Sequence, residues 1–129
     1  MTRKQARDEA FILIFEKQFS DATTSEILEL AKEVRDLEPD DYIIEVFCGV
    51  VDRDEELTEI ISNKAIGWKI ERISKISQAI MKLAIFEILY MDSIPSSVSI
   101  NEAVELCKKY ATQDDASFVN GILASVVKV

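Results

Sequence analysis

The residues best placed to do chemistry are three cations near the start of the chain. Arg3, Lys4 and Arg7 stand in the stretch MTRKQAR, which holds no acid, although the formal net charge of the chain is -9. An arginine guanidinium can donate two parallel hydrogen bonds to a phosphate or stack on an unpaired base. Charged residues at a terminus are also commonly just solvated. These cations therefore indicate either an anion-binding patch or an ordinary solvated helix start.

The acidic charge is concentrated in one part of the sequence. Between Ser20 and Glu59, fourteen acids stand against three bases, a net charge of -11, so the rest of the chain carries +2. This asymmetry is compatible with a local basic face that holds a short anionic strand weakly. The acidic stretch is either a solvated helix surface or a surface for a basic protein partner. The bases outside it form three groups: Arg3, Lys4 and Arg7; Lys64, Lys69, Arg72, Lys75 and Lys82; Lys108 and Lys109.

Residue sets for catalysis or metal binding are few. The chain has no histidine, so a serine or cysteine nucleophile lacks its commonest base. Asp114 and Asp115 are adjacent at an expected helix start, where carboxylates more often cap backbone amides than share acid–base work. Cys48 and Cys107 lie far apart on apolar faces, and we expect buried free thiols. We expect no enzyme, no metal and no cofactor.

Composition and periodicity predict an all-α fold in a single domain. The 129 residues are 48% hydrophobic and 30% charged, with three glycines and two prolines. Such a chain is too apolar for disorder and too poor in turn formers for an all-β fold. No stretch alternates with a period of two residues for long enough to form a strand. No apolar run is long enough to cross a bilayer, so we expect a cytoplasmic protein without membrane contact.

Capping residues predict where several helices begin. A capping box of Thr2 and Gln5 precedes a first helix from about Arg3 to Phe19, and a second box of Ser99 and Glu102 is expected later in the chain. Pro39 ends the second helix, Asp40 or Asp41 caps the third, and a slip in the apolar pattern near Asp52 predicts a kink or a new helix. Gly67 and Trp68 are expected to introduce a short turn of helix. Ser74 caps the most apolar segment, which we expect to be the central helix.

Three stretches together resemble one known family. They are the basic start MTRKQARDEAFILIFE, the segment WKIERISKISQAIMKLAIFEILYMDSIP and the segment SVSINEAVELCKKYATQDDASFVNGIL. The chain is similar over almost its whole length to the NusB family of bacterial transcription antitermination factors. The resemblance implies a NusB-like fold of about seven helices in two packed bundles, about residues 1–62 and 63–129. It also implies binding of the boxA element of nascent ribosomal RNA together with NusE, ribosomal protein S-ten, in an RNA polymerase antitermination complex.

The resemblance leaves alternatives for the function. One is the NusB-like accessory domain of some ribosomal RNA methyltransferases, although 129 residues leave no room for a cofactor-binding catalytic domain. Another is a helical adaptor that binds only proteins, through its acidic half. Family members occur as monomers and as dimers, and a homodimer could hide the basic face.

The family pattern also assigns roles to individual residues. It implies that Arg3, Lys4 and Arg7 contact the RNA backbone, and that Phe15, where relatives often have tyrosine, stacks or packs. Phe118 either stacks a base or belongs to the core. Further RNA-facing positions are Asp114, which would repel phosphate, and Lys82, Lys108 and Lys109, which would extend the basic track or simply be solvated.

Two positions depart from the family pattern. Ser77 stands where an acid is usual, at a position associated with the protein partner, so the affinity for that partner could be reduced. Ala111 replaces a usual glycine and would cost about 1 kcal/mol if the backbone there needed a positive φ. For Asn101, Glu102, Asn120 and Gly121, which match the pattern, we expect structural roles in capping and close packing.

Overall fold

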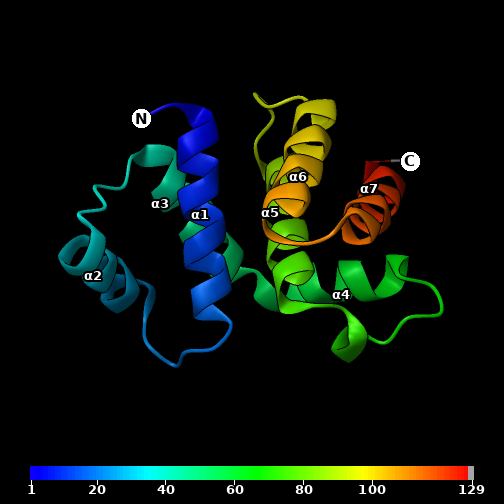
Figure 1. Cartoon of the computed structure of the whole chain (residues 1–129), viewed down its shortest axis with the longest axis horizontal. Helices are drawn as coiled ribbons and strands as arrows, with labels where there is room; N and C mark the ends of the chain where they lie inside the picture. The colour runs from blue at the N-terminus through cyan, green and yellow to red at the C-terminus, as the bar shows by residue number, and fades with distance from the viewer. Residues whose placement is uncertain (128–129) are drawn as a thin grey trace.

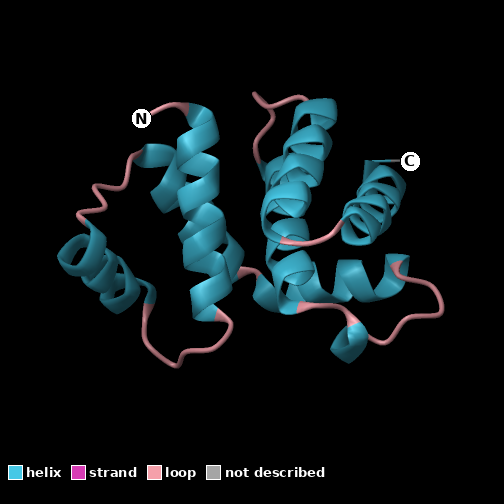
Figure 2. Ribbon diagram, viewed as in Figure 1, coloured by secondary structure: helices cyan, strands magenta, loops and turns pink. Residues whose placement is uncertain are grey.

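The computed structural model describes residues 1–127 and, within them, contains helices and no strand (Figures 1 and 2). The predicted all-α class is confirmed. The elements in chain order are α1 (Arg3–Lys17), α2 (Thr24–Arg35), α3 (Asp41–Asp52), α4 (Asp54–Lys64), the short 3-10 helix η1 (Ile70–Arg72), α5 (Lys75–Tyr90), α6 (Ser96–Tyr110) and α7 (Gln113–Val127). None of the helices in this part of the chain is both long and apolar enough to cross a membrane.

Local sequence explains several of the helix starts. Thr2 and Gln5 form the predicted capping box, in which each side chain accepts a hydrogen bond from the backbone N–H of the other. Asp40 caps α3 by accepting from the N–H of Ile43 at 2.9 Å, and Ser74 caps α5. These caps satisfy backbone donors that have no partner within the helix. The slip in the pattern near Asp52 marks a new helix, because α3 ends there and α4 begins at Asp54.

Two local predictions are corrected and one is confirmed. The capping box of Ser99 and Glu102 does not exist: α6 begins at Ser96, directly after Pro95, whose backbone is extended with φ -61° and ψ 140°, and Ser99 lies inside the helix. The short helical turn that Gly67 and Trp68 were expected to introduce is confirmed, because η1 follows them after the left-handed Gly67, whose φ is 84°. The first helix ends at Lys17, two residues before Phe19.

Helix α5 is the centre of the fold. All of its residues from Ser77 to Glu87 are buried, which agrees with the prediction of a central helix. Helices α1 and α3 pack on one side of it and α6 and α7 on the other, while α2 lies at the outer edge beside α1 (Figure 1). Helix α4 packs against α5 and α7 and has little contact with α3. Helix α4 therefore lies beside the C-terminal helices, and the division into two bundles near residue 62 stays a prediction.

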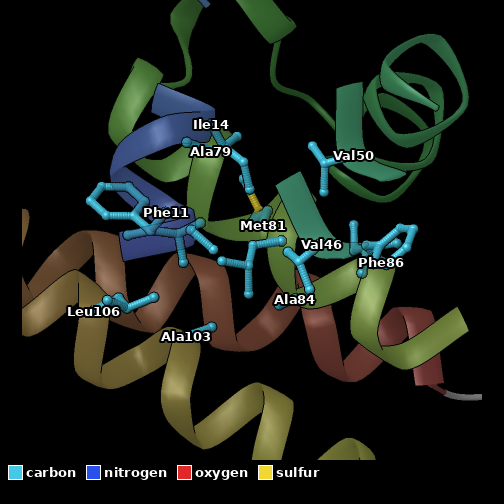
Figure 3. Packing of buried hydrophobic residues seen from close by; sticks show 14 of the residues in the cluster. Phe11, Ile14, Val46, Val50, Ala79, Met81, Ala84, Phe86, Ala103 and Leu106 are labelled. Carbon is cyan, nitrogen blue, oxygen red and sulfur yellow. The ribbon is translucent and has the colours of Figure 1, made fainter. Parts of the chain in front are cut away.

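The core is continuous across α5. Met81 of α5 points toward α1 and α3, close to Phe11, Ile14 and Val46 (Figure 3). Two cysteines contribute as small apolar side chains: Cys107 is buried, Cys48 is half-buried, and both thiols are free. Burial raises the pKa of Cys107 to about 12, so this thiol is protonated and inert at neutral pH.

Gly49 is required where α3 crosses α5. A Cβ atom at this position would lie 2.3 Å from Cζ of Phe86, whose ring is buried. We expect Gly49→Ala to lower the free energy of unfolding by about 1 to 3 kcal/mol, because overpacking outweighs the gain of about 1 kcal/mol in helix propensity. Urea unfolding measures the difference.

Gly121→Ala is the matched control for Gly49→Ala. Gly121 also lies inside a helix, but nothing stands within 4 Å of a Cβ there. Here helix propensity acts alone, and we expect stabilisation of up to about 1 kcal/mol. Equal stabilisation by both substitutions would show that α3 and α5 do not need the close approach at Gly49.

Candidate nucleic-acid interface

The N-terminal turn of α1 presents two exposed cations. Arg3 and Lys4 follow the capping residue Thr2, and both side chains reach solvent. The guanidinium of Arg3 lies over the ring of Tyr42 on α3, with its Cζ 4.4 Å from the ring centroid. The Nζ of Lys4 lies 3.3 Å from a carboxylate oxygen of Glu102 on α6. Contacts from two other helices thus orient both cations while leaving them accessible to a phosphate.

Arg7, one turn further along α1, is buried. Its Nε donates to the carboxylate of Glu87 at 2.8 Å and its Nη2 donates to the same group at 3.4 Å. Burial lowers the pKa of Arg7, but the hydrogen bond and charge of Glu87 outweigh burial and raise that pKa overall. Arg7 therefore remains charged and fully engaged inside the protein, and it does not share the exposed surface of Arg3 and Lys4.

Glu87 accepts hydrogen bonds from side chains of three other helices. It is fully buried on α5 and accepts from Arg7 of α1, from the hydroxyl of Ser99 of α6 at 2.7 Å, and from the hydroxyl of Tyr42 of α3. Burial and the charge of Glu87 raise the pKa of Tyr42, so its hydroxyl stays protonated and donates. The ring of the same tyrosine lies under the guanidinium of Arg3. Tyr42 therefore connects the buried hydrogen-bond network to this exposed cation.

Lys82 is held in the same way at the other end of α1. Its Nζ lies 2.8 Å from Asp54 at the start of α4 and donates to the side-chain oxygen of Gln18 at 3.2 Å. Gln18 in turn donates to the backbone carbonyl of Lys75 at 2.9 Å. Lys82 is buried, so it joins α1, α4 and α5 and does not lie on the exposed basic track that the sequence suggested.

Lys108 and Lys109 are exposed near the end of α6. The Nζ of Lys109 contacts Asp8 of α1 at 2.5 Å, and hydrogen bonds to Asp8 and Tyr110 raise the pKa of this lysine. Lys108 lies 3.8 Å from Glu105 of its own helix. A shallow groove of about 260 Å³ separates α1 from α6; it is lined by Lys4, Gln5, Arg7, Asp8, Glu102, Glu105, Leu106 and Lys109. Its acids and bases are balanced in number, so only the exposed cationic heads at its rim can attract phosphate.

The two aromatic candidates lie in different places. Phe15 is half-buried between Phe11 of its own helix and Phe19, which follows the end of α1, and it faces α2. Phe118 on α7 is also half-buried, and its ring meets Trp68 edge to face at 5.5 Å between centroids. Trp68 is 55% exposed, and sequence reasoning missed it as a possible stacking surface. The signal was available, because it is the only tryptophan of the chain and stands beside a lysine.

Asp114 and Asp115 have separate roles at the start of α7. Asp115 and Thr112 exchange hydrogen bonds, since the Thr112 hydroxyl accepts from the Asp115 N–H at 3.0 Å and the carboxylate accepts from the Thr112 N–H at 3.2 Å. Capping is therefore confirmed for Asp115. Asp114 is exposed on the rim of a pocket of about 220 Å³; this pocket is lined by Trp68, Arg72, Ile73, Ser74, Asp114, Asp115 and Phe118.

Comparison with known proteins identifies the family. A family model described as the NusB family matches residues 4–128. The chain belongs to the NusB family. The transcription antitermination protein NusB of Ruminiclostridium cellulolyticum is 43% identical over 130 residues, covering 99% of this chain and 90% of that protein. That of Bacillus velezensis is 35% identical, covering 98% and 95%.

Solved structures of the family share the fold. NusB from T. maritima superposes with a TM-score of 0.86 at 29% identity, covering 99% of this chain and 92% of that one. A crystal structure of the antitermination factors NusB and NusE in complex with dsRNA gives a TM-score of 0.86 at 26% identity, covering 98% and 96%. The resemblance seen in the sequence and the expected NusB-like fold are confirmed.

The two departures from the NusB pattern have structural explanations. Ser77 is 1% exposed, and its hydroxyl has no hydrogen-bond partner among the described residues, so its side chain does not reach a surface where a partner could bind. Ala111 has a negative φ of -129°, so the cost of a left-handed alanine does not arise.

The network around Glu87 predicts a large effect of a small substitution. Glu87→Gln removes the charge that compensates Arg7 while keeping the volume, and we expect a loss of about 3 to 5 kcal/mol in the free energy of unfolding. Glu102→Gln, which removes the partly exposed partner of Lys4, should cost less than about 1 kcal/mol. Chemical unfolding of both variants gives the comparison, and equal small losses would mean that the buried pair does not hold the helices together.

Proposed function

We propose that this chain is a transcription antitermination factor that binds the boxA element of nascent ribosomal RNA together with NusE. The observation that carries the proposal is the pair of exposed, oriented cations at the capped start of α1, on a chain that belongs to the NusB family. A structure of the same fold is a complex of NusB and NusE with dsRNA. The chain acts in the cytoplasm as an adaptor without catalytic chemistry, within a larger RNA polymerase assembly.

The predicted RNA-binding residues divide into two groups by exposure. Arg3, Lys4, Lys108 and Lys109 contact phosphates directly, because their charged heads lie at the surface of α1 and α6. Arg7 and Lys82 act from inside the protein as positioning residues that hold α1 against α5. These two residues therefore act by fixing the position of α1, and they do not contact the RNA.

The aromatic and acidic positions modulate this interface. Phe118 has the more favourable placement for stacking a base, since its ring lines an open pocket beside Trp68, whereas Phe15 packs between α1 and α2. Exposed Asp114 repels phosphate at the rim of the same pocket and so limits affinity. With few direct contacts and acids between the bases, RNA binding by the chain alone is weak, and NusE supplies the remaining affinity.

Salt dependence of RNA binding tests the proposal. Each phosphate contact by a lysine or arginine contributes about -0.7 to the slope of log K against log salt for a single strand, so contacts by Arg3, Lys4, Lys108 and Lys109 give a slope of about -2.8. We expect the double substitution Arg3→Gln and Lys4→Gln to reduce the magnitude of the slope by about 1.4 with the helical circular dichroism unchanged. Labelled boxA RNA and a scrambled RNA, with and without NusE, are titrated at several salt concentrations. Equal, feeble binding of both RNAs in the presence of NusE would refute the antitermination function.

A separate comparison of variants tests whether Arg7 positions α1 or contacts the RNA. Arg7→Lys keeps a buried cation near Glu87 but loses the two-pronged hydrogen bonding, so we expect lower stability and weaker RNA binding with the same salt slope. Arg3→Gln is the control, and its slope should change by about 0.7. If Arg7→Gln, measured where it is still folded, reduces the slope as Arg3→Gln does, Arg7 contacts the RNA directly and the positioning role is wrong.

A further inference from the structure

Helix α2 exposes apolar side chains that its own packing does not need. Only Ile27 and Ala31 of this helix are buried. Leu30 and Val34, one turn apart, are 54% and 74% exposed and form a strip beside the buried residues. The helix lies at the outer edge of the molecule, with α1 between it and α6 (Figure 1). A ligand can therefore approach this strip without meeting the rest of the fold.

The strip continues into a groove between α2 and the end of α1. We name as the α1–α2 groove the depression of about 380 Å³ that is lined by Phe15, Glu16, Phe19, Ser20, Ala22, Glu26, Ile27 and Leu30. Phe19 is 64% exposed and stands edge to face against Phe15 at 5.1 Å between ring centroids. The groove thus has an apolar floor and an exposed aromatic wall, features that suit the anchor residues of a peptide.

The border of the groove is acidic. Glu26 and Glu33 lie four residues before and three residues after Leu30, on the same side of α2. Glu26 accepts the backbone hydrogen bond of Thr23, which lowers the pKa of this glutamate, so it is ionised at neutral pH. Arg35, the arginine of α2, is engaged by Glu9 and Glu16. The surrounding sequence from Ser20 to Glu59 has a net charge of -11.

The charge of this face decides between possible occupants. A nucleic acid is repelled, since its phosphates would meet ionised glutamates. A second copy that docked the same face would bring two acidic borders together. A protein segment with one or two apolar anchors flanked by lysine or arginine complements both the floor and the rim.

We propose that the α1–α2 groove and the Leu30–Val34 strip bind a basic amphipathic segment of a protein partner. The site is separate from the cations at the other end of α1, which as a 15-residue helix is about 22 Å long. The proposal therefore goes beyond the RNA-binding function and does not depend on it. The two ends of α1 would serve two ligands at the same time, so that the chain links an RNA to a further protein.

Two synthetic peptides probe the groove. Both are fluorescein-labelled helix-forming peptides of 14 residues with leucine at alternating spacings of three and four, one with lysine and the other with glutamate at the polar positions. We expect the lysine peptide to raise fluorescence anisotropy on binding the full chain and the glutamate peptide to bind at least tenfold more weakly. Amide chemical shifts should change in α2 and at the end of α1.

Matched variants locate the binding. Leu30→Ser with Val34→Ser should lower the affinity for the lysine peptide about tenfold. Ile66→Ser, which alters an 89% exposed apolar residue outside the groove, should leave this affinity unchanged. Glu26→Gln with Glu33→Gln should weaken it several-fold and flatten its salt dependence. All substitutions are at exposed positions, and circular dichroism checks the fold.

Three results would overturn the proposal. The first is peptide binding that Leu30→Ser with Val34→Ser does not weaken, or that Ile66→Ser weakens equally. The second is a loss of RNA binding in the Leu30 and Val34 variant, which would make the face part of the RNA site. The third is self-association, measured by sedimentation, that this variant abolishes, which would identify a second copy as the occupant.

Discussion

The buried carboxylate of Glu87 is the constraint around which the helices are arranged. A charge removed from water is tolerated only when it is paired and hydrogen-bonded. Glu87 meets this requirement with donors from α1, α3 and α6. These donors come from both sides of the central helix, so the N-terminal and C-terminal helices cannot separate without leaving a buried charge unpaired. Apolar packing around α5 supplies the bulk of the stability, and this network sets which faces of the helices meet.

The same network determines which basic residues are available for RNA. Arg7 is used inside the protein, while Arg3 rests on the ring of Tyr42, whose hydroxyl is bound to Glu87. At the opposite end of α1, Lys82 joins Gln18 and Asp54. Helix α1 is thus fixed to the core at both ends, and its exposed cations are presented from a rigid support. Oriented groups of this kind lose little conformational entropy when a ligand binds.

Charge is divided along the chain in a way that suits an adaptor. Exposed cations lie at the start of α1 and near the end of α6, and a further group lies between the end of α4 and the start of α5: Lys64, Lys69, Arg72 and Lys75. The acids are concentrated in the segment that forms α2, α3 and α4. An acidic surface discourages phosphate from spreading beyond the basic positions and leaves room for partners of the opposite sign. The proposed RNA-binding cations and the proposed α1–α2 groove lie at opposite ends of α1.

The sequence alone determined the helical class, most helix starts and the family, because apolar periodicity and capping depend on residues three or four positions apart. It also located Arg3 and Lys4 correctly at an exposed helix start. It could not separate Arg7 from them, since the partner of Arg7 lies 80 residues away. The same reason explains the wrong predictions for Lys82, Ser77 and Ser99. The neighbours of a polar residue in the sequence do not indicate which helix its side chain will contact in the fold. Only tertiary packing, which brings distant helices together around one buried charge, decided which polar residues are inside and which remain at the surface.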